Sequence, residues 1–309
     1  MPSTQKTVLI TGCSAGGIGN ELALEFHARG LRVIATARRA QAMENLANAG
    51  ITTLILDVAD PESVARAKDA VAQLTGGTLD ILVNNAGQPY TCPAIDINPA
   101  RAKAIFDVNL WGPIQMVQAF IPLLIAAAAS ASASGARIVQ IGSTAGVAPV
   151  PFSAIYNASK AALHSYSDTL RVELAPFNVK VTSIIAGGVQ TNIDMHSATS
   201  IPAGSRYRPM EDIYQAKAAA TRNTVMTDPR AFAKTVVDEA LAARPRAWLY
   251  AGYMAWAIWL VHTFGGQRAF DGIMSSRFGI SGFAAMVKGG EVPLTAPGQD
   301  APKPAGVSA

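Results

Sequence analysis

Short apolar runs alternate with stretches of helical spacing along the first half of the chain. The runs are rich in β-branched residues, which favour strands. The predicted strands are residues 7–11, 32–36, 52–56 and 79–84, and the predicted helices between them are residues 19–29, 40–49 and 61–74. Continuous apolar strands separated by helices are typical of a parallel sheet with both faces covered. The pattern therefore predicts an α/β fold.

The alternation continues into the second half and then weakens. The further predicted elements are a long helix at 101–129, a strand at 137–142, a helix at 153–175, a strand at 180–185 and a helix at 229–243. The Ala- and Ser-rich stretch 126–135 is expected to end the long helix and form a loop. Residues 190–228 have little regular pattern, and so long a segment is usually a lid or a binding loop. We call this segment the lid. We predict one domain over residues 1–293 and a disordered tail at 294–309.

The composition is that of a folded protein. Of the 309 residues, 50% are hydrophobic and 15% are charged, which is typical of a globular domain. The net charge of +4 includes no run of Lys or Arg, so we predict no nucleic-acid partner. Cys13 and Cys92 lack metal-ligand spacing and cannot form a disulfide framework, so we predict no metal site. The first residues do not have the pattern of a signal peptide, and we expect a cytoplasmic protein.

A glycine-rich turn lies between the first predicted strand and the first predicted helix. It reads TGCSAGGIG over residues 11–19. Glycines let the backbone approach a pyrophosphate, and the helix N-terminus offers the anion N–H groups and the positive end of its dipole. The candidate dinucleotide contacts are Gly12, Ser14, Gly17, Ile18 and Gly19. The alternative is a turn that binds nothing, which the strand–turn–helix context disfavours.

The end of the second predicted strand indicates which dinucleotide binds. NAD-selective sites usually carry an acidic residue there, which binds the ribose hydroxyls. This chain has Ala37 followed by Arg38 and Arg39, and a guanidinium suits a 2′-phosphate. We therefore predict NADPH, with Arg38 as a contact, although the two arginines could also be solvated surface residues. Asp57, after the third strand, either contacts the adenine or only caps the next turn.

Tyr156 and Lys160 lie four residues apart in a predicted helix and therefore share one face. A phenol has an unperturbed pKa of about 10, and a neighbouring ammonium lowers that pKa by favouring the phenolate. Ser143 follows the fifth predicted strand, at the sheet edge where ligands bind in open α/β folds. A hydroxyl there can hold a substrate carbonyl while Tyr156 donates a proton to it.

Taken together, these motifs resemble the short-chain dehydrogenase/reductase family over roughly residues 7–243. The matching motifs are the glycine-rich turn, Asn84-Asn85-Ala86-Gly87, Asn109, Ser143 and Tyr156 with Lys160. The resemblance implies a Rossmann-type doubly wound parallel sheet of about seven strands flanked by helices. The last strand would lie near residues 246–251, after the lid. The family also implies a homo-oligomer.

The resemblance also implies the role of each site residue. Asn109 would hold a water in a proton relay to Lys160, and Lys160 would also bind the nicotinamide ribose. Tyr156 would be the acid in reduction, and Ser143 would position the carbonyl. The further implied cofactor contacts are Asn85, Ala86, Gly87, Tyr156, Lys160, Val189 and Thr191.

Two motifs depart from the family pattern. The first turn has one residue more than TGxxxGxG, which could change the glycine that faces the pyrophosphate. Gly187-Gly188 replaces the usual Pro-Gly after the sixth strand, so we expect a looser loop there.

Within the family, the stretches NNAGQ, VPFSAIYNASKAALHSY and GGVQT resemble fungal 1-acyldihydroxyacetone-phosphate reductases. This resemblance implies reduction of an acylated ketone phosphate by NADPH in lipid synthesis. A ketoreductase for an apolar secondary metabolite, steroid or polyketide is the alternative within the same class. A non-catalytic NADPH-binding sensor or scaffold is the alternative from another class, and the presence of all four of Asn109, Ser143, Tyr156 and Lys160 disfavours it.

Residues outside these motifs bear on the substrate. The lid carries Arg206, Arg208, Lys217 and Arg222, which either bind a substrate phosphate or form a solvated face. The candidates for an apolar acyl pocket, or else for the core, are Tyr90, Trp111, Phe152, Met195 and Tyr214. Cys13 and His164 are interpreted as packing residues.

Residues 247–264 carry no Asp, Glu, Lys or Arg. They form either a buried strand and helix or a peripheral membrane contact through Trp248, Trp256 and Trp259, and a true span is disfavoured. The resemblance to lipid-synthesis enzymes adds the endoplasmic reticulum membrane and lipid droplets as expected locations.

Overall fold

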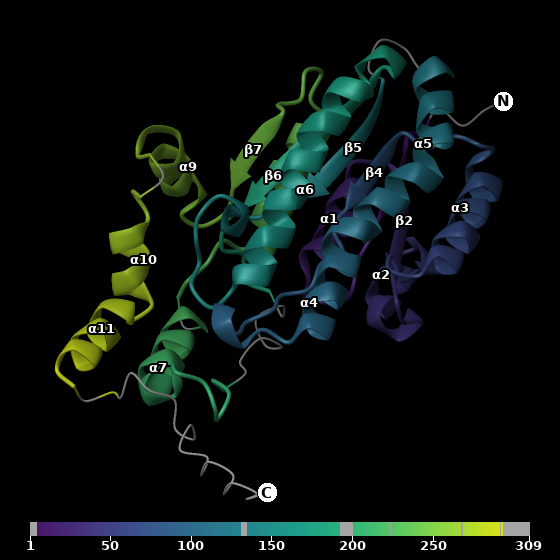
Figure 1. Ribbon diagram of the computed structural model, residues 1–309. Coiled ribbons are helices and arrows are strands. Elements are labelled where there is room, and N and C mark those ends of the chain that lie inside the picture. The colour runs from purple at the N-terminus through teal and green to yellow at the C-terminus, as the bar shows by residue number, and fades with distance from the viewer. Residues whose placement is uncertain are drawn as a thin grey trace, which may run out of the picture.

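The computed structural model describes residues 5–130, 135–191, 200–222, 224–266, 268–290 and 292. Its centre is one sheet of seven parallel strands in the order β3-β2-β1-β4-β5-β6-β7 (Figure 1). The strands are β1 (Thr7–Ile10), β2 (Arg32–Ala37), β3 (Thr52–Ile55), β4 (Ile81–Asn84), β5 (Ala136–Ile141), β6 (Val179–Ala186) and β7 (Trp248–Ala251). The predicted fold class is confirmed. From β1 the chain adds β2 and β3 toward one edge of the sheet, and from β4 it adds β5, β6 and β7 toward the other edge. Open α/β sheets bind ligands at such a switch point, here between β1 and β4.

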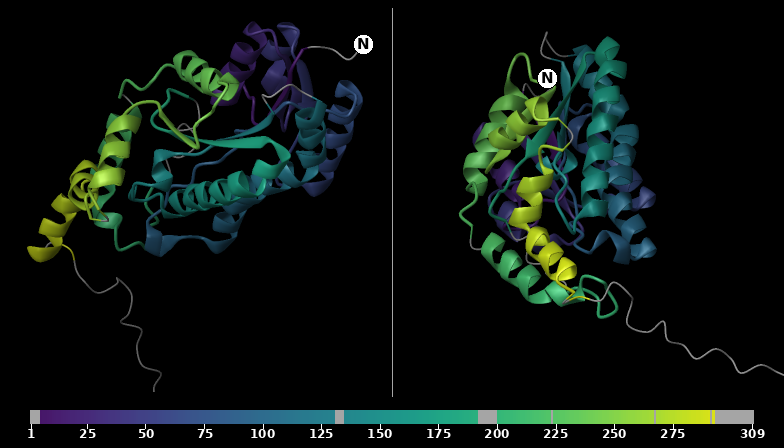
Figure 2. Two further views of the ribbon diagram at one scale, coloured as in Figure 1. Left: turned by 90° about the horizontal axis from the view of Figure 1, so that it is seen from above. Right: turned by 60° about the vertical axis from the view of Figure 1, so that its left-hand side comes forward.

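Helices cover both faces of the sheet, as Figures 1 and 2 show. On one face, α1 (Ile18–Ala28) and α8 (Pro229–Leu241) bury Phe26 and Phe232 against the strands. On the other face lie α3 (Pro61–Thr75), α5 (Gly112–Ser130) and α6 (Ala154–Glu173), whose core includes Phe120. The predicted helix at 40–49 is a 3-10 turn, η1 (Ala40–Met43), followed by α2 (Glu44–Asn48).

The predicted helix at 101–129 is not one regular helix. It is divided into α4 (Pro99–Phe106), a π-helical turn, η3 (Asp107–Trp111), and α5. Gly112 begins α5 against Val58, and a Cβ at Gly112 would lie 2.8 Å from Val58 Cγ2. The close approach explains why a glycine stands at this junction. At the other end α5 runs to Ser130, one residue beyond the predicted end, and its last turns are rich in alanine, the best helix former.

The lid is more regular than predicted. It contains a 3-10 turn, η7 (Arg208–Met210), and a twelve-residue helix, α7 (Glu211–Arg222). Strong helix formers such as alanine dominate α7, and Glu211 and Asp212 favour its N-terminus. The side chains of 217, 218, 221 and 222, and all of residues 192–199, lie outside the description.

The apolar segment 247–264 is a strand and a short helix, not a single element. β7 joins the sheet, and α9 (Ala255–Phe264) follows a tight turn in which Met254 has a φ of 59°. Two helices that were not predicted come next, α10 (Asp271–Arg277) and α11 (Ile280–Lys288), and they extend to α7 (Figure 1). Phe278 and Phe283 pack there against the core of Phe152, Met210 and Tyr214. The predicted tail at 294–309 lies outside the described residues.

Within the described residues, the helical stretch formed by α4, η3 and α5, residues 99–130, is apolar and long enough to cross a membrane. Half of its most apolar window is buried inside the fold, as in the core helix of a globular domain. The ten residues of α9 are too few for a span.

Candidate active site

The glycine-rich turn is fastened to the loop that follows β4. Gly12 has a φ of 73°, and a Cβ there would lie 2.9 Å from Ala86 Cα. A Cβ at Gly19 would lie 2.5 Å from Asn85 Nδ2. Four predicted cofactor contacts, Gly12, Gly19, Asn85 and Ala86, are therefore packed together, and at both glycines only a hydrogen fits.

Thr11 holds the two loops together, and sequence reasoning did not assign it a role. Its Oγ1 accepts the N–H groups of Asn85 at 2.9 Å and of Ala86 at 3.0 Å. In return, Asn85 Nδ2 donates to the carbonyls of Thr11 at 2.8 Å and Gly12 at 3.0 Å. A buried hydroxyl directly after a strand and before a glycine turn was the signal in the sequence.

The start of α1 fits a pyrophosphate. Gly17 is its N-cap residue and supplies no side-chain cap, so the first N–H groups of the helix remain available for an anion. Ser14 is exposed at the tip of the turn, and Gly16 has a φ of 74°. Ile18 and Gly19 form the first turn of α1. After Gly12, Gly16 is the second glycine of the turn with a left-handed backbone conformation.

The end of β2 lies against this turn. The Cys13 N–H donates to the Thr36 carbonyl at 2.8 Å, and the Ala15 N–H donates to the Ala42 carbonyl at 2.8 Å. Arg38, two residues after Thr36, is exposed beside the turn. Cys13 itself is a packing residue, since burial raises the pKa of its thiol to about 12.

Asp57 forms hydrogen bonds within the turn before α3, in agreement with the alternative that it caps this turn. Its Oδ1 accepts the Ala59 N–H at 3.0 Å, and its own N–H donates to Ser63 Oγ at 3.1 Å. These bonds fix the turn before α3. A contact between Asp57 and the adenine remains a prediction.

The loop after β6 is not loose, contrary to the expectation from Gly187-Gly188. The Gly188 N–H donates to the Tyr253 carbonyl at 3.1 Å, and the Gly188 carbonyl accepts N–H groups from Tyr253 at 3.0 Å and Thr227 at 3.2 Å. A Cβ at Gly187 would overlap the Tyr253 carbonyl oxygen. Val189 is buried in this loop and Thr191 is half-buried two residues later.

Lys160 is a residue of α6, and its side chain reaches the end of β5. Its side chain is buried, and Nζ donates to the Ile141 carbonyl at 2.8 Å. Nζ also lies 5.9 Å from the ring centroid of Tyr156, one turn earlier in the same helix. Burial lowers the pKa of Lys160 to about 8. The predicted pairing of amine and phenol is therefore present in the fold.

Ser143 follows Ile141 by two residues and is held from two sides. Its Oγ accepts the Ala145 N–H at 3.1 Å, and its own N–H donates to Nε2 of His164 at 3.2 Å. The side chain is half-buried at the carboxyl edge of the sheet. Ser143 and Lys160 are thus both anchored at the end of β5.

Asn109 lies in the π-helical turn and is fully buried. Its Oδ1 accepts the Gln88 N–H at 2.8 Å, while its Nδ2 donates to the Gln88 carbonyl at 2.9 Å and to Ser159 Oγ at 3.0 Å. The side chain therefore joins the loop after β4 to α6. Its role toward a water remains a prediction. Gln88 and Ser159 were not foreseen because only the fold brings them to Asn109.

Gly87 shows how closely the site is assembled. A Cβ at Gly87 would lie 3.4 Å from Asn109 Oδ1 and 3.5 Å from Lys160 Nζ. The loop after β4, the π-helical turn and α6 thus meet at one point. Such an arrangement places an amine, a phenol and a hydroxyl around the edge where a dinucleotide would end, which suits proton transfer to a bound carbonyl.

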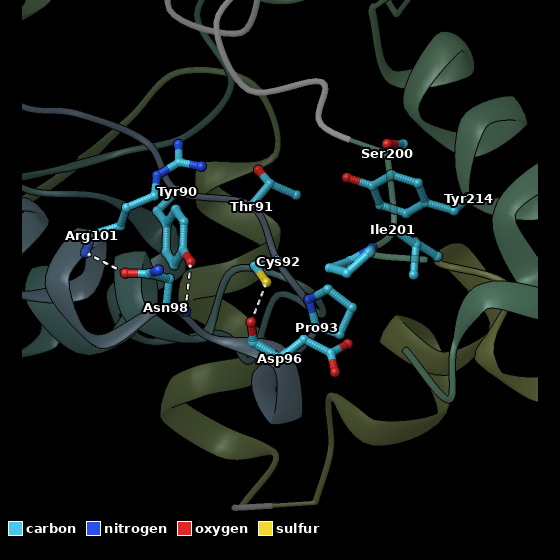
Figure 3. Close-up of a pocket in the computed structure, with 11 residues that line it drawn as sticks. Tyr90, Thr91, Cys92, Pro93, Asp96, Asn98, Arg101, Ser200, Ile201 and Tyr214 are labelled. Atoms are coloured by element: carbon cyan, nitrogen blue, oxygen red, sulfur yellow. Dashed lines mark hydrogen bonds between the residues drawn. The ribbon is translucent and has the colours of Figure 1, made fainter. Parts of the chain in front are cut away.

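A cavity of about 500 Å³ opens between the loop after β4 and the lid. Figure 3 shows Tyr90 and Arg101 on one side and Ser200 and Tyr214 on the other. Of the predicted pocket aromatics, Tyr90 and Tyr214 line the cavity, and Phe152 packs behind Tyr214 with the ring centroids 5.3 Å apart. Trp111 is 53% exposed and does not line this cavity. Met195 lies outside the described residues.

The basic residues near the cavity differ from the prediction. Arg208 Nη1 pairs with Glu211 at 3.1 Å and donates to the Ile201 carbonyl at 2.8 Å, so its charge is already balanced. The side chains of Lys217 and Arg222 lie outside the description, and Arg206 does not line the cavity. Arg101, which was not predicted, lines the cavity with its guanidinium 5.2 Å from the Tyr90 ring centroid.

Comparison with known proteins is consistent with this site. The family model described as short chain dehydrogenase matches residues 6–201. The chain is 44% identical over 282 residues to a short-chain dehydrogenase, srdE, of Neurospora crassa, covering 91% of this chain and 94% of the relative. It is 49% identical over 210 residues to the NADPH-dependent 1-acyldihydroxyacetone phosphate reductase of Schizosaccharomyces pombe, covering 66% and 69%.

A solved structure shares the fold. The crystal structure of a short-chain dehydrogenase from Streptomyces avermitilis matches with a TM-score of 0.71 and 24% identity, over 94% of this chain and all of that one. The matched region contains the glycine-rich turn, the π-helical Asn109, Ser143, Tyr156 and Lys160. The chain therefore belongs to the short-chain dehydrogenase family of oxidoreductases.

Proposed function

We propose that this protein catalyses the NADPH-dependent reduction of a ketone to a secondary alcohol. The position of Lys160 is the observation that carries the proposal. Its Nζ is fixed 2.8 Å from the Ile141 carbonyl oxygen and 5.9 Å from the Tyr156 ring centroid. A buried amine held this close to a phenol, beside a serine at a strand end, favours proton donation to a carbonyl oxygen.

Asn109, Ser143, Tyr156 and Lys160, which we call the tetrad, each take part in the proposed reaction. NADPH, when bound, supplies the hydride that forms the new C–H bond at the carbonyl carbon. Ser143 holds the carbonyl oxygen with its hydroxyl, and Tyr156 gives its phenolic proton to that oxygen, which completes the alcohol. Lys160 stabilises the resulting phenolate by its positive charge. A proton from solvent then restores Tyr156, through a relay in which we place Asn109 and Lys160.

The cofactor assignment rests on the residues around the first turn. The uncapped start of α1 and the glycines packed against Asn85 and Ala86 suit a pyrophosphate. Arg38 stands where an acidic residue would select NADH, and its guanidinium suits the 2′-phosphate of NADPH. The relative from Schizosaccharomyces pombe is named for the same cofactor. We propose further contacts from Gly87, Val189 and Thr191.

We propose an acylated ketone phosphate, such as 1-acyldihydroxyacetone phosphate, as the substrate. The 49% identity to the reductase named for that substrate supports the class. The cavity beside Tyr90 and Tyr214 offers Arg101 as an anion partner, since Arg101 forms no ion pair with any described residue. A guanidinium in that position could bind a phosphate.

A substrate panel tests this proposal. Oxidation of NADPH is followed with 1-acyldihydroxyacetone phosphate and with the same ketone lacking its phosphate, and the alcohol product is identified. We expect at least a tenfold preference for the phosphorylated ketone, and Arg101→Met should remove the preference without slowing the other ketone. Absence of alcohol product from any ketone would contradict the reductase proposal itself.

Reduction of an apolar secondary metabolite is the second candidate. It is favoured by the pairing of Arg208 with Glu211, which leaves less charge in the lid for a phosphate. The 44% identical relative is named only as a short-chain dehydrogenase, which does not restrict the substrate. Equal rates with the phosphorylated and unphosphorylated ketones would favour this candidate.

We propose that the protein is cytoplasmic and contacts a lipid surface, such as the endoplasmic reticulum or a lipid droplet, through α9. Trp256 is 69% exposed and Phe264 is 72% exposed, with Trp259 and Leu260 exposed between them. Tryptophan on an exposed apolar helix favours the membrane interface. Flotation with liposomes tests the contact: the double variant Trp256→Ser, Phe264→Ser should no longer float, and flotation that persists would contradict the proposal.

We also propose a homo-oligomer, which light scattering at micromolar concentration would detect.

A further inference from the structure

His164 lies on α6 one turn after Lys160, and only 3% of its surface is exposed. Its Nε2 lies 3.2 Å from the backbone nitrogen of Ser143 and accepts that N–H. An acceptor nitrogen carries no proton, so the imidazole must hold its proton on Nδ1. The bond connects α6, which carries Tyr156 and Lys160, to Ser143, whose hydroxyl holds the carbonyl in the proposed reaction.

The chain around Ser143 is shaped to admit this ring. Gly142 and Gly146 flank Ser143, and a Cβ at Gly142 would overlap Nε2 of His164. A Cβ at Gly146 would lie 2.6 Å from Cε1 of the same ring. Neither glycine has a positive φ, so backbone conformation does not require them. The His164 ring is the nearest obstacle to a side chain at both glycines, and the Ile184 carbonyl oxygen and the Ala161 nitrogen follow at 3.0 Å from the two Cβ positions.

The other side of the ring is closed by β7. The ring centroids of His164 and Trp248 lie 5.1 Å apart, and Trp248 Nε1 donates to Asp168 Oδ1 at 3.0 Å. Trp248 is therefore held in place by α6. The imidazole is confined between the end of β5, the turn after Ser143, and β7, with Nε2 toward the Ser143 nitrogen.

A histidine that only filled space at this position would lower the stability of the fold. Its Nδ1 is buried and has no hydrogen-bond partner among the described residues. An apolar side chain of similar volume would avoid that cost, because a buried polar group without a partner destabilises the fold. The bond from Ser143 to Nε2 is thus the feature that distinguishes His164 from a core residue.

We propose that His164 is a positioning residue, which fixes the backbone at Ser143 so that the serine hydroxyl meets the substrate carbonyl. The inference rests on the proposed function, in which Ser143 holds that carbonyl. Burial, followed by the positive charges of Lys160 and His262, lowers the pKa of His164 to about 4. The ring therefore stays neutral and keeps its acceptor at every pH at which the enzyme would be assayed.

Side-chain length allows a matched pair of variants. In glutamine the amide oxygen is three bonds from Cβ, as Nε2 is in histidine, so His164→Gln can still accept the Ser143 N–H. In asparagine the oxygen is two bonds from Cβ and cannot reach it, although the side chain remains a polar amide. Each variant is made with Ser143 present and in the Ser143→Ala background. Turnover, KM for the ketone, NADPH affinity and the melting temperature are measured for all of them.

We expect His164→Asn to lower kcat about tenfold, since a misplaced catalytic group commonly costs that much or more. His164→Gln should stay within about threefold of the wild type, and NADPH affinity should be unchanged in both. In the Ser143→Ala background, His164→Asn should have no further effect on kcat. That result is the signature of action through the serine, because a general loss of packing would lower kcat in both backgrounds.

Two results would overturn the inference while leaving the reductase proposal intact. One is an equal loss of kcat on His164→Asn in both backgrounds. The other is a His164→Gln variant as slow as His164→Asn at the same melting temperature. Full turnover by Ser143→Ala alone would instead show that the serine does not hold the carbonyl, which removes both the proposed role of Ser143 and that of His164.

Discussion

Lys160 is kept inside the fold at a cost in stability. Burial of an ammonium disfavours its charged form, and the pKa of Lys160 falls from the ordinary 10.5 to about 8. At neutral pH the amine is charged in both the folded and the unfolded state, so the folded state carries the full penalty. Residues that impose such a cost are concentrated at functional sites. The penalty is what distinguishes Lys160 from an ordinary surface lysine.

Lys160→Met should therefore stabilise the protein at pH 7 while abolishing turnover. The shift corresponds to about 3 kcal/mol, and we expect a gain of about 1–3 kcal/mol because the Ile141 carbonyl loses its donor. Between pH 8 and 10.5 the unfolded state binds more protons at this group than the folded state, so the penalty falls as pH rises. Urea unfolding at pH 7 and pH 10 measures the difference between variant and wild type, which should shrink at the higher pH.

The exposed Lys234 provides the control, since Lys234→Met should show neither effect. A Lys160→Met variant less stable than the wild type at pH 7 would contradict the account of a costly buried amine.

Arg38 should determine the choice between the two nicotinamide cofactors. Arg38→Asp replaces a 2′-phosphate partner by a group that repels the phosphate and binds ribose hydroxyls. We expect KM for NADPH to rise at least tenfold and KM for NADH to fall or stay the same. Initial rates with each cofactor measure this, with Arg39→Asp as the neighbouring control. Equal changes for NADPH and NADH would show that Arg38 does not contact the 2′ position.

At the scale of elements, hydrophobic spacing predicts which segments are helices better than it predicts their interruptions. Residues 101–129 read as one helix because their apolar positions recur without a break, and alanine extends the pattern. The π-helical turn depends on tertiary contacts: Asn109 must reach Gln88 and Ser159, and Gly112 must approach Val58. No local signal carries those requirements.

The contact between Gly112 and Val58 gives a test of that explanation. Gly112→Ala should destabilise the protein by about 1–3 kcal/mol, because its Cβ would meet Val58 in a packed core. The same substitution in the Val58→Ala background should cost about 1 kcal/mol less, since Cγ2, the nearest obstructing atom, is gone. Chemical unfolding of the four proteins measures the coupling. Additive costs would show that another contact requires the glycine.

At the scale of the whole molecule, the sheet and the tetrad could be predicted, whereas the substrate side could not. The seven parallel strands and the positions of Tyr156, Lys160 and Ser143 follow from motifs at fixed places in the topology. Helices α10 and α11 went unrecognised because Gly272, Gly279 and Gly282 weaken their helical signal. Arg101 was missed and Arg208 overvalued because charge pairing depends on neighbours that only the fold supplies.

The central claim is that Tyr156 gives the proton that completes ketone reduction. The most direct test is the single-turnover rate of NADPH oxidation with one ketone for Tyr156→Phe, compared with Tyr166→Phe on the same helix. A general acid contributes roughly a hundred- to ten-thousandfold, so Tyr156→Phe should be slowed by about three orders of magnitude at saturating NADPH. Tyr166→Phe should match the wild type. Turnover by Tyr156→Phe at the wild-type rate would contradict the account.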